Sequence, residues 1–107
     1  MAYDEAVDQR VQRLIADWNP ERKKMFGGTC YLIAGNMLCG VNQDLVILRV
    51  DKDDTDELLR HPAVGAFGMT GRRMAGFLEV PSGAVDDEEL SELLQHCHDY
   101  VRSLPPK

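Results

Sequence analysis

The sequence predicts an α+β fold with two layers, in which a single antiparallel sheet packs on helices. Apolar residues near both ends of the chain recur at the spacing of amphipathic helices, and the middle of the chain holds short apolar runs separated by turn residues. A length of 107 residues fits one domain, which we place at residues 1–107. The predicted order is helix, three strands, helix, one or two strands, helix.

The first predicted helix covers residues 3–18. Its apolar positions follow the helical period on one face, and Asn19-Pro20 ends it, because Asn tolerates a left-handed cap and Pro cannot continue a helix. The residues of this stripe are Val7, Val11, Leu14, Ile15 and Trp18.

Residues 23–51 predict a three-stranded antiparallel meander with tight turns at Gly35-Asn36 and Asn42-Gln43. This register makes one face of the sheet entirely apolar, and a shift of one residue would disrupt it. The predicted core face consists of Cys30, Leu32, Ala34, Met37, Cys39, Val41, Val46, Leu48 and Val50.

The opposite face of the predicted sheet is semi-apolar, although a sheet covered on one side normally turns a polar face to water. We interpret it as an interface, with a second copy of the chain as the simplest partner, so a homodimer is expected. The alternative is that a helix or the N-terminal segment covers part of it. The candidate interface residues are Tyr31, Ile33, Leu38, Leu45, Ile47 and Phe77.

The second half of the chain predicts two helices and a strand. Residues 51–62 form a short helix with acidic residues in its first turn, residues 64–71 a loop or short strand, and residues 72–81 a strand ending at Pro81. Asp86 and Glu89 have the spacing of a capping box for the last helix. The apolar stripe of that helix is Leu90, Leu93, Leu94, Cys97, Val101 and Leu104.

The net charge of −6 disfavours broad attraction to nucleic acid or to anionic lipid. No apolar run approaches the ~20 residues that span a bilayer. The acidic N-terminus is unlike a secretory signal, so we expect a cytoplasmic protein. Three cysteines without a CxxC pair do not predict a disulfide framework.

Basic residues stand beside glycines at two places in this acidic chain. Lys23 and Lys24 precede Gly27-Gly28, and Arg72 and Arg73 lie between Gly71 and Gly76. Together with Arg49, these four are candidates for binding an anionic ligand, nucleic acid or a partner, since arginine recognises carboxylate and phosphate. The alternative is that the glycines shape a strand bend and the arginines pair with local acids such as Glu79, because phosphate loops lead into helices.

No residue pattern predicts catalysis, a metal or a cofactor. His96, Cys97 and His98 are consecutive, and on a helix such side chains point about 100° apart and cannot converge on one ion. Cys30 and Cys39 fit buried inert thiols, and no Ser-His-Asp pattern is present. We therefore do not expect an enzyme.

Several stretches in combination resemble the TfoX N-terminal domain family. They are "KKMFGGTCYLIAGNMLCGV", "LVILRV", "MTGRRMAGFLEV" and the closing "SLPPK", and the resemblance covers about residues 10–107. It implies a two-layer α+β fold related to secretion-chaperone-like domains, in a bacterial, cytoplasmic protein grouped with competence regulators and without catalytic residues. Arg73 departs from the family pattern, which usually has proline there. Regulation of competence genes is an expectation from this resemblance.

Overall fold

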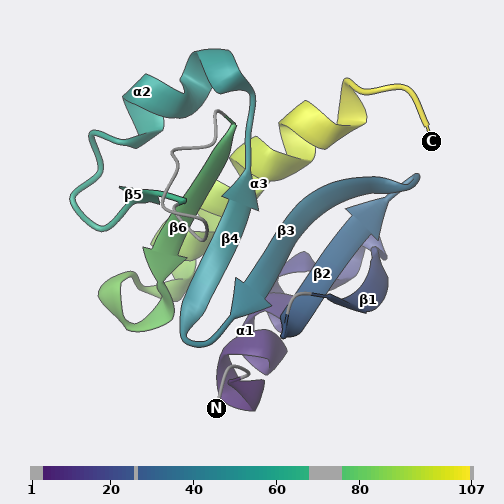
Figure 1. Ribbon diagram of the computed structural model, residues 1–107, viewed down its shortest axis with the longest axis horizontal. Coiled ribbons are helices and arrows are strands. Elements are labelled where there is room, and N and C mark those ends of the chain that lie inside the picture. The colour runs from purple at the N-terminus through teal and green to yellow at the C-terminus, as the bar shows by residue number, and fades with distance from the viewer. Residues whose placement is uncertain (1–3, 26, 68–75, 107) are drawn as a thin grey trace.

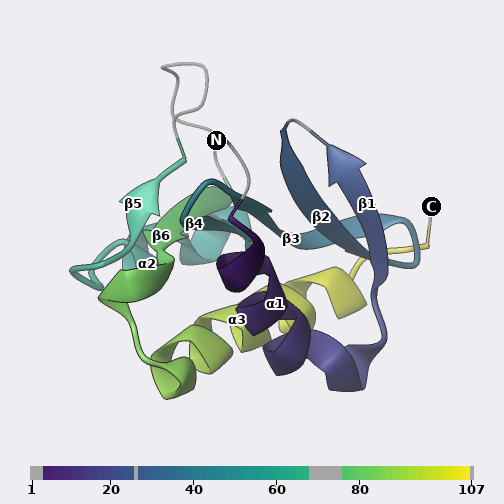
Figure 2. The ribbon, with the colours of Figure 1, turned by 90° about the horizontal axis from the view of Figure 1, so that it is seen from below.

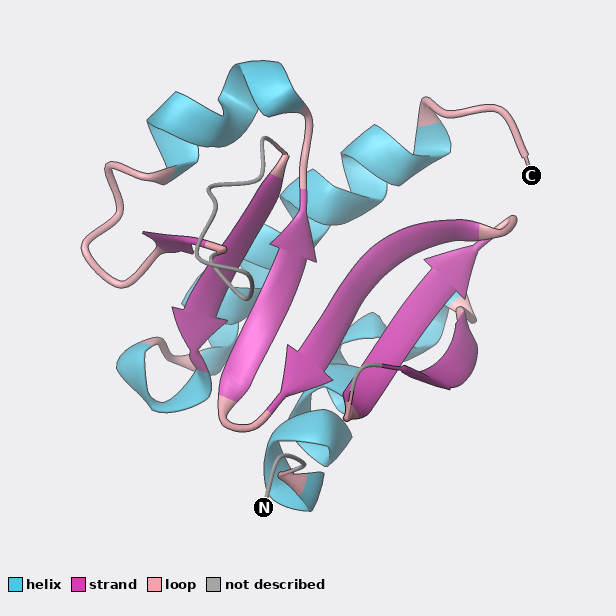
Figure 3. Cartoon of the chain, viewed as in Figure 1, coloured by secondary structure: helices cyan, strands magenta, loops and turns pink. Residues whose placement is uncertain are grey.

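The computed structural model describes residues 4–25, 27–67 and 76–106. All strand pairs form one antiparallel sheet in the order β1-β2-β3-β4-β6-β5 (Figures 1 and 3). The strands are β1 (Glu21–Met25), β2 (Gly28–Ile33), β3 (Asn36–Asn42), β4 (Leu45–Arg49), β5 (Gly65–Ala66) and β6 (Phe77–Pro81), and the α-helices are α1 (Glu5–Ile15), α2 (Thr55–Leu58) and α3 (Asp87–Arg102).

Helices α1 and α3 lie on the same side of the sheet, as Figure 2 shows. We call that side the covered face. Apolar residues of both helices and of the central strands pack there in one cluster, which includes Val11, Leu48, Leu78, Leu94 and Val101. The opposite side, the open face, has no helix over it among the described elements. The predicted α+β fold with two layers is confirmed.

Both long helices are present, with α1 (Glu5–Ile15) shorter than the predicted 3–18 and α3 starting directly after Asp86, the first residue of the predicted capping box. The Asp4 carboxylate accepts hydrogen bonds from the backbone N–H groups of Ala6 and Val7, which caps α1. After the 3₁₀ turn Ala16–Trp18, Asn19 takes the left-handed conformation with φ of 49° and ends the helical segment.

At α3 the capping box is present, because Asp86 accepts from the backbone N–H of Glu89 and the Glu89 carboxylate accepts in return. Five residues of the predicted stripe on α3 are buried: Leu90, Leu93, Leu94, Cys97 and Val101. Leu104, the sixth, lies beyond the helix and is half-buried.

The predicted three-stranded meander is present as β2, β3 and β4, but strand β1, which precedes it and pairs with β2, was not predicted. Four of the five residues of β1 are charged, which hides it from any apolar pattern. The strand is held by backbone pairing with β2, from Glu21 opposite Leu32 to Met25 opposite Gly28. It is an edge strand, where lysines are typical because they discourage pairing with other chains.

Both predicted turns are wrong by one residue. Ile33 pairs with Asn36, so Ala34 and Gly35 form the turn, with φ of 52° and 84° as in a two-residue hairpin with positive φ at both positions. The second turn consists of Gln43 and Asp44, because Asn42 pairs with Leu45.

A bulge in β3 explains the shift at the first turn. Tyr31 pairs with Cys39 and Leu32 with Met37, which leaves Leu38 as an extra residue. Leu38 and Cys39 are both fully buried in the core cluster. Because a bulge brings two consecutive apolar side chains to the same layer, core packing determines this register more than turn propensity does.

The bulge changes which residues of β2 face the helices. Thr29 and Tyr31 point to the covered face, whereas Cys30, predicted there, lies in the row of Gly40 and Ile47 on the open face. Leu32 and Met37 also move to the open face. After the bulge the prediction is confirmed, since Cys39, Val41, Val46, Leu48 and Val50 are all in the core cluster.

Three of the six predicted interface residues therefore do not belong to an exposed face. Tyr31 and Leu38 are core residues, with 2% and 0% of their surface exposed, and Ile33 packs against the same core. Leu45, Ile47 and Phe77 alternate with core residues of β4 and β6 and lie on the open face. Arg72 and Arg73 lie outside the described residues.

Candidate functional site on the open face of the sheet

The open face is made of the strand residues that alternate with the core positions. One row runs across four strands from Cys30 through Gly40 and Ile47 to Glu79. Neighbouring rows add side chains from β1 to β6. The open-face residues used below are Lys23, Cys30, Leu32, Met37, Gly40, Leu45, Ile47, Arg49, Phe77 and Glu79.

The middle of the open face is apolar and close-packed. A side chain at Gly40 would meet the Met37 Cε at 3.4 Å and the Cys30 Sγ at 3.6 Å, so these two side chains fill the space over the glycine. Ile47, beside them on β4, keeps 6% of its surface exposed, whereas Leu45 and Phe77 are half-buried. Ile47 is therefore buried, and the exposed part of this apolar region comes from Met37, Leu45 and Phe77.

Arg49 lies at the end of β4 in contact with two aromatic rings. Its guanidinium carbon is 6.0 Å from the ring centroid of Phe77 and 5.6 Å from that of Tyr100 on α3. The pairing of β3 with β4 stops at Cys39–Leu48, one residue before Arg49. Such contacts hold a guanidinium by attraction to the ring faces. Within the described residues no carboxylate lies within 4 Å of it.

The candidate basic residues do not form one patch in the described structure. Lys23 pairs with Cys30 and lies on the open face, but its neighbour Lys24 pairs with Thr29 and points to the other side. Lys23 and Arg49 stand three strand spacings apart, roughly 14 Å across the sheet at about 4.8 Å a step, and two residues apart along the strands. Their participation in binding an anion stays a prediction.

A buried polar cluster on the covered face was missed by the sequence analysis. The Asp8 carboxylate on α1 has no exposed surface, and it accepts from Arg22 Nη2 at 2.8 Å, Thr29 Oγ1 at 3.3 Å and Gln12 Nε2 at 3.3 Å, and also from the Tyr31 hydroxyl. Burial first, and then the hydrogen bond to Asp8, raises the pKa of Tyr31, which keeps its hydroxyl a donor. The cluster ties α1 to β1 and β2.

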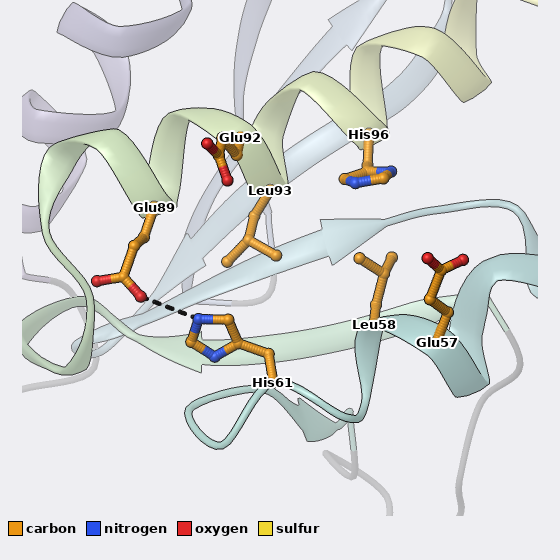
Figure 4. A pocket seen from close by; sticks show the side chains of 7 residues that line it. All are labelled: Glu57, Leu58, His61, Glu89, Glu92, Leu93 and His96. Atoms are coloured by element: carbon orange, nitrogen blue, oxygen red, sulfur yellow. Dashed lines mark hydrogen bonds and ion pairs between the residues drawn. The ribbon is translucent and has the colours of Figure 1, made fainter.

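A shallow pocket of about 340 Å³ lies between α2 and α3 (Figure 4). It is lined by Glu57, Leu58, His61, Glu89, Glu92, Leu93 and His96. The backbone N–H of Ala63 donates to His61 Nδ1 at 3.1 Å, so the neutral ring carries its proton on Nε2 and donates it to Glu89 at 3.0 Å. In the part of the chain that the structure describes, no three His, Cys, Asp or Glu side chains are grouped to hold a metal ion.

The three consecutive residues His96, Cys97 and His98 point to different surroundings. His96 lines the pocket, Cys97 is fully buried in the core, and His98 stacks on Trp18 with ring centroids 4.1 Å apart. Burial, and to a lesser extent the nearby Arg102 charge, lowers the pKa of His98. The three side chains therefore point in different directions, as predicted from the geometry of consecutive residues on a helix.

All three thiols are free and buried. Burial raises the pKa of Cys97 to about 12 and the pKa of Cys39 well above its ordinary value. The pKa of Cys30 is also raised by burial. Thiols with these pKa values are poor nucleophiles at neutral pH, because the thiolate is the reactive form. Their predicted burial is confirmed, although Cys30 and Cys39 lie on opposite faces of the sheet.

These features define a small α+β domain with a two-helix covered face and an apolar, arginine-bearing open face. The family model for the TfoX N-terminal domain matches residues 15–99, and the chain belongs to that family. No curated protein and no solved structure matched the chain. Within the described residues no helix is long and apolar enough to cross a membrane.

Proposed function

We propose that this chain is a non-enzymatic interaction domain that binds a protein through the open face of its sheet. The observation that carries the proposal is the partly exposed apolar side chains of Leu45 and Phe77, which lie on the side opposite α1 and α3 (Figure 2). Contiguous apolar surface rimmed by charged residues is typical of protein interaction sites. Family membership supports a role in the manner of competence regulators, acting in the cytoplasm on gene regulation.

The buried thiols support a non-enzymatic role. Their pKa values are raised by burial rather than lowered by a neighbouring cation, which is the opposite of what an activated cysteine needs. The side chains that surround the Asp8 carboxylate hold it inside the core, away from the open face.

The proposal is tested by capturing bound proteins with the wild-type chain and with a variant whose open face is altered. The tagged chain is cross-linked in its own cells beside the variant Leu45→Asp/Phe77→Ser and the control Ala84→Asp, whose residue is exposed in the loop before α3. We expect the cross-linked protein to fall at least tenfold in the open-face variant and to stay constant in the control.

Two results would contradict the proposal. One is equal capture by the open-face variant, once its circular dichroism shows that it is folded. The other is a wild-type chain that yields neither a cross-linked partner nor a cross-linked copy of itself.

A further inference from the structure

Four open-face positions form a small quadrilateral on two neighbouring strands. Ile47 is paired with Glu79, and Arg49 is paired with Phe77. The apolar residues therefore occupy one diagonal, Ile47–Phe77, and the charged residues occupy the other, Arg49–Glu79. Diagonal positions in an antiparallel pair stand about 7–8 Å apart.

Neither charged residue has a salt-bridge partner within the described residues. Arg49 is half-buried and its guanidinium contacts the rings of Phe77 and Tyr100, but within the described residues no carboxylate pairs with it. Glu79 is also half-buried, and its Cγ lies beside Gly65 of β5, which leaves room on that side of the carboxylate.

A two-fold axis along the Ile47–Phe77 diagonal would exchange the two charged corners. In an isologous dimer a residue i contacts j of the other copy, and j contacts i. An axis through the apolar diagonal places Arg49 of each copy opposite Glu79 of the other. It also packs Phe77 of both copies near the axis, whereas Ile47 is already buried in the single chain. Both charges would be drawn out of water with partners in place.

We propose that the open face binds a second copy of this chain, with Arg49 of each copy paired to Glu79 of the other. The proposal rests on the protein-binding function proposed above and names the partner and the register. The occupant follows from charge complementarity: one cation and one anion without an ion pair among the described residues, placed symmetrically about the Ile47–Phe77 diagonal.

Charge reversal at each corner tests the register. Arg49→Glu and Glu79→Arg each create two like-charge contacts in a dimer of identical chains. We expect each variant alone to raise the dimer dissociation constant at least about a hundredfold in sedimentation equilibrium. An equimolar mixture of the two variants should dimerise again, because acidic and basic side chains then face each other at both contacts. The double variant Arg49→Glu/Glu79→Arg should dimerise by itself for the same reason.

Matched controls separate this register from a general charge effect. Arg60→Glu and Glu88→Arg make the same two charge changes at exposed positions. Arg60 follows α2 and Glu88 lies on α3. We expect both variants to keep the wild-type dissociation constant. If a reversed variant does not fold by circular dichroism, Arg49→Gln and Glu79→Gln replace it, each expected to weaken the dimer at least tenfold.

The outcomes distinguish this inference from the proposed function. A wild-type chain that is monomeric up to about 1 mM overturns the second copy as partner, while loss of a captured protein in Leu45→Asp/Phe77→Ser would still support an interaction face. A dimer that resists both reversals, or a mixture that does not recover, overturns the Arg49–Glu79 register. A dimer unaffected by Leu45→Asp/Phe77→Ser would show that the open face is not the dimer interface.

Discussion

The two faces of the sheet both carry ionisable groups among apolar side chains, but they satisfy them differently. On the covered face, Asp8 is fully buried and receives hydrogen bonds from α1, β1 and β2. On the open face, Arg49 and Glu79 have no ion pair within the described residues. A buried charge without partners is strongly unfavourable, whereas a half-buried charge stays partly hydrated and can pair with a group of another molecule. The first arrangement stabilises a fold, and the second is suited to association.

The largest difference between the faces should appear when leucines of the same strand are truncated. Leu48→Ala removes a fully buried side chain and should lower the free energy of unfolding by about 3 kcal/mol. Leu45→Ala, on the half-buried open face, should cost less than about 1 kcal/mol. Urea unfolding at a concentration where the chain is monomeric measures both. Equal losses would show that the open face is part of the folding core.

Thiol reactivity should separate the faces next, because Cys39 lies in the core and Cys30 on the open face. Cys39 lies in the core and its pKa is raised well above the ordinary value, so alkylation near pH 8 should be more than about a hundredfold slower in the folded than in the unfolded chain. Cys30 is covered on the open face by Met37 and should react faster than Cys39.

Met37→Ala sharpens the same measurement. It should accelerate labelling of Cys30 and leave Cys39 unchanged, with the sites read by mass spectrometry. Prompt labelling of Cys39 in the wild type would contradict the assignment of faces.

Disrupting the Asp8 cluster should lower the free energy of unfolding somewhat less than Leu48→Ala does. Asp8→Ala removes the carboxylate that accepts hydrogen bonds from the Tyr31 hydroxyl and from Arg22 Nη2 and should lower the free energy of unfolding by about 2 kcal/mol, because one partner of a buried set is removed while the others stay. Arg22 is partly exposed, which limits the loss. Tyr31→Phe is the control that removes one donor and keeps the ring. A change below about 0.5 kcal/mol for Asp8→Ala would show that water replaces the carboxylate.

The smallest effect is expected at an exposed charge cluster. Asp87 accepts from Arg10 at 2.7 Å and from Arg13 at 3.0 Å, and the hydrogen bond from Arg10 lowers the pKa of Asp87. A carboxyl whose pKa is lower in the folded chain stabilises it above the unfolded pKa, and that stabilisation is lost as the pH falls through the folded pKa. Asp87→Asn should therefore shift the urea midpoint slightly at neutral pH and not in strong acid.

Added salt should reduce the neutral-pH shift, because the pair is exposed to solvent. A shift of equal size in strong acid would mean that the amide, rather than the lost charge, is responsible.

The sequence predicted the helices and the C-terminal half of the sheet well, because their signals are local. Asn19 and the Asp86–Glu89 pair mark helix ends through their own chemistry. The bulge at Leu38 could not be predicted from the sequence, since it results from packing two consecutive side chains into a core formed by distant elements. Strand β1 was missed because backbone pairing alone defines it.

The open face was only partly predictable for the same reason. Once the bulge moved Tyr31 and Leu38 into the core, the face kept Leu45, Ile47 and Phe77 and gained Cys30 and Met37. The Asp8 cluster did leave a trace in the sequence. Asp8 stands seven residues before Ile15, which places the acid on the buried side of a helix.

The stacking of Trp18 on His98 gives the protein a natural optical reporter. Trp18 is the single tryptophan of the chain, and its ring lies parallel to the imidazole within 6°, at the contact between the first helical segment and α3. A protonated imidazole quenches indole emission, so fluorescence should rise as His98 loses its proton and should change again when the two helical segments separate. Because this contact lies on the covered side of the sheet, the signal can report helix docking while the open face is occupied.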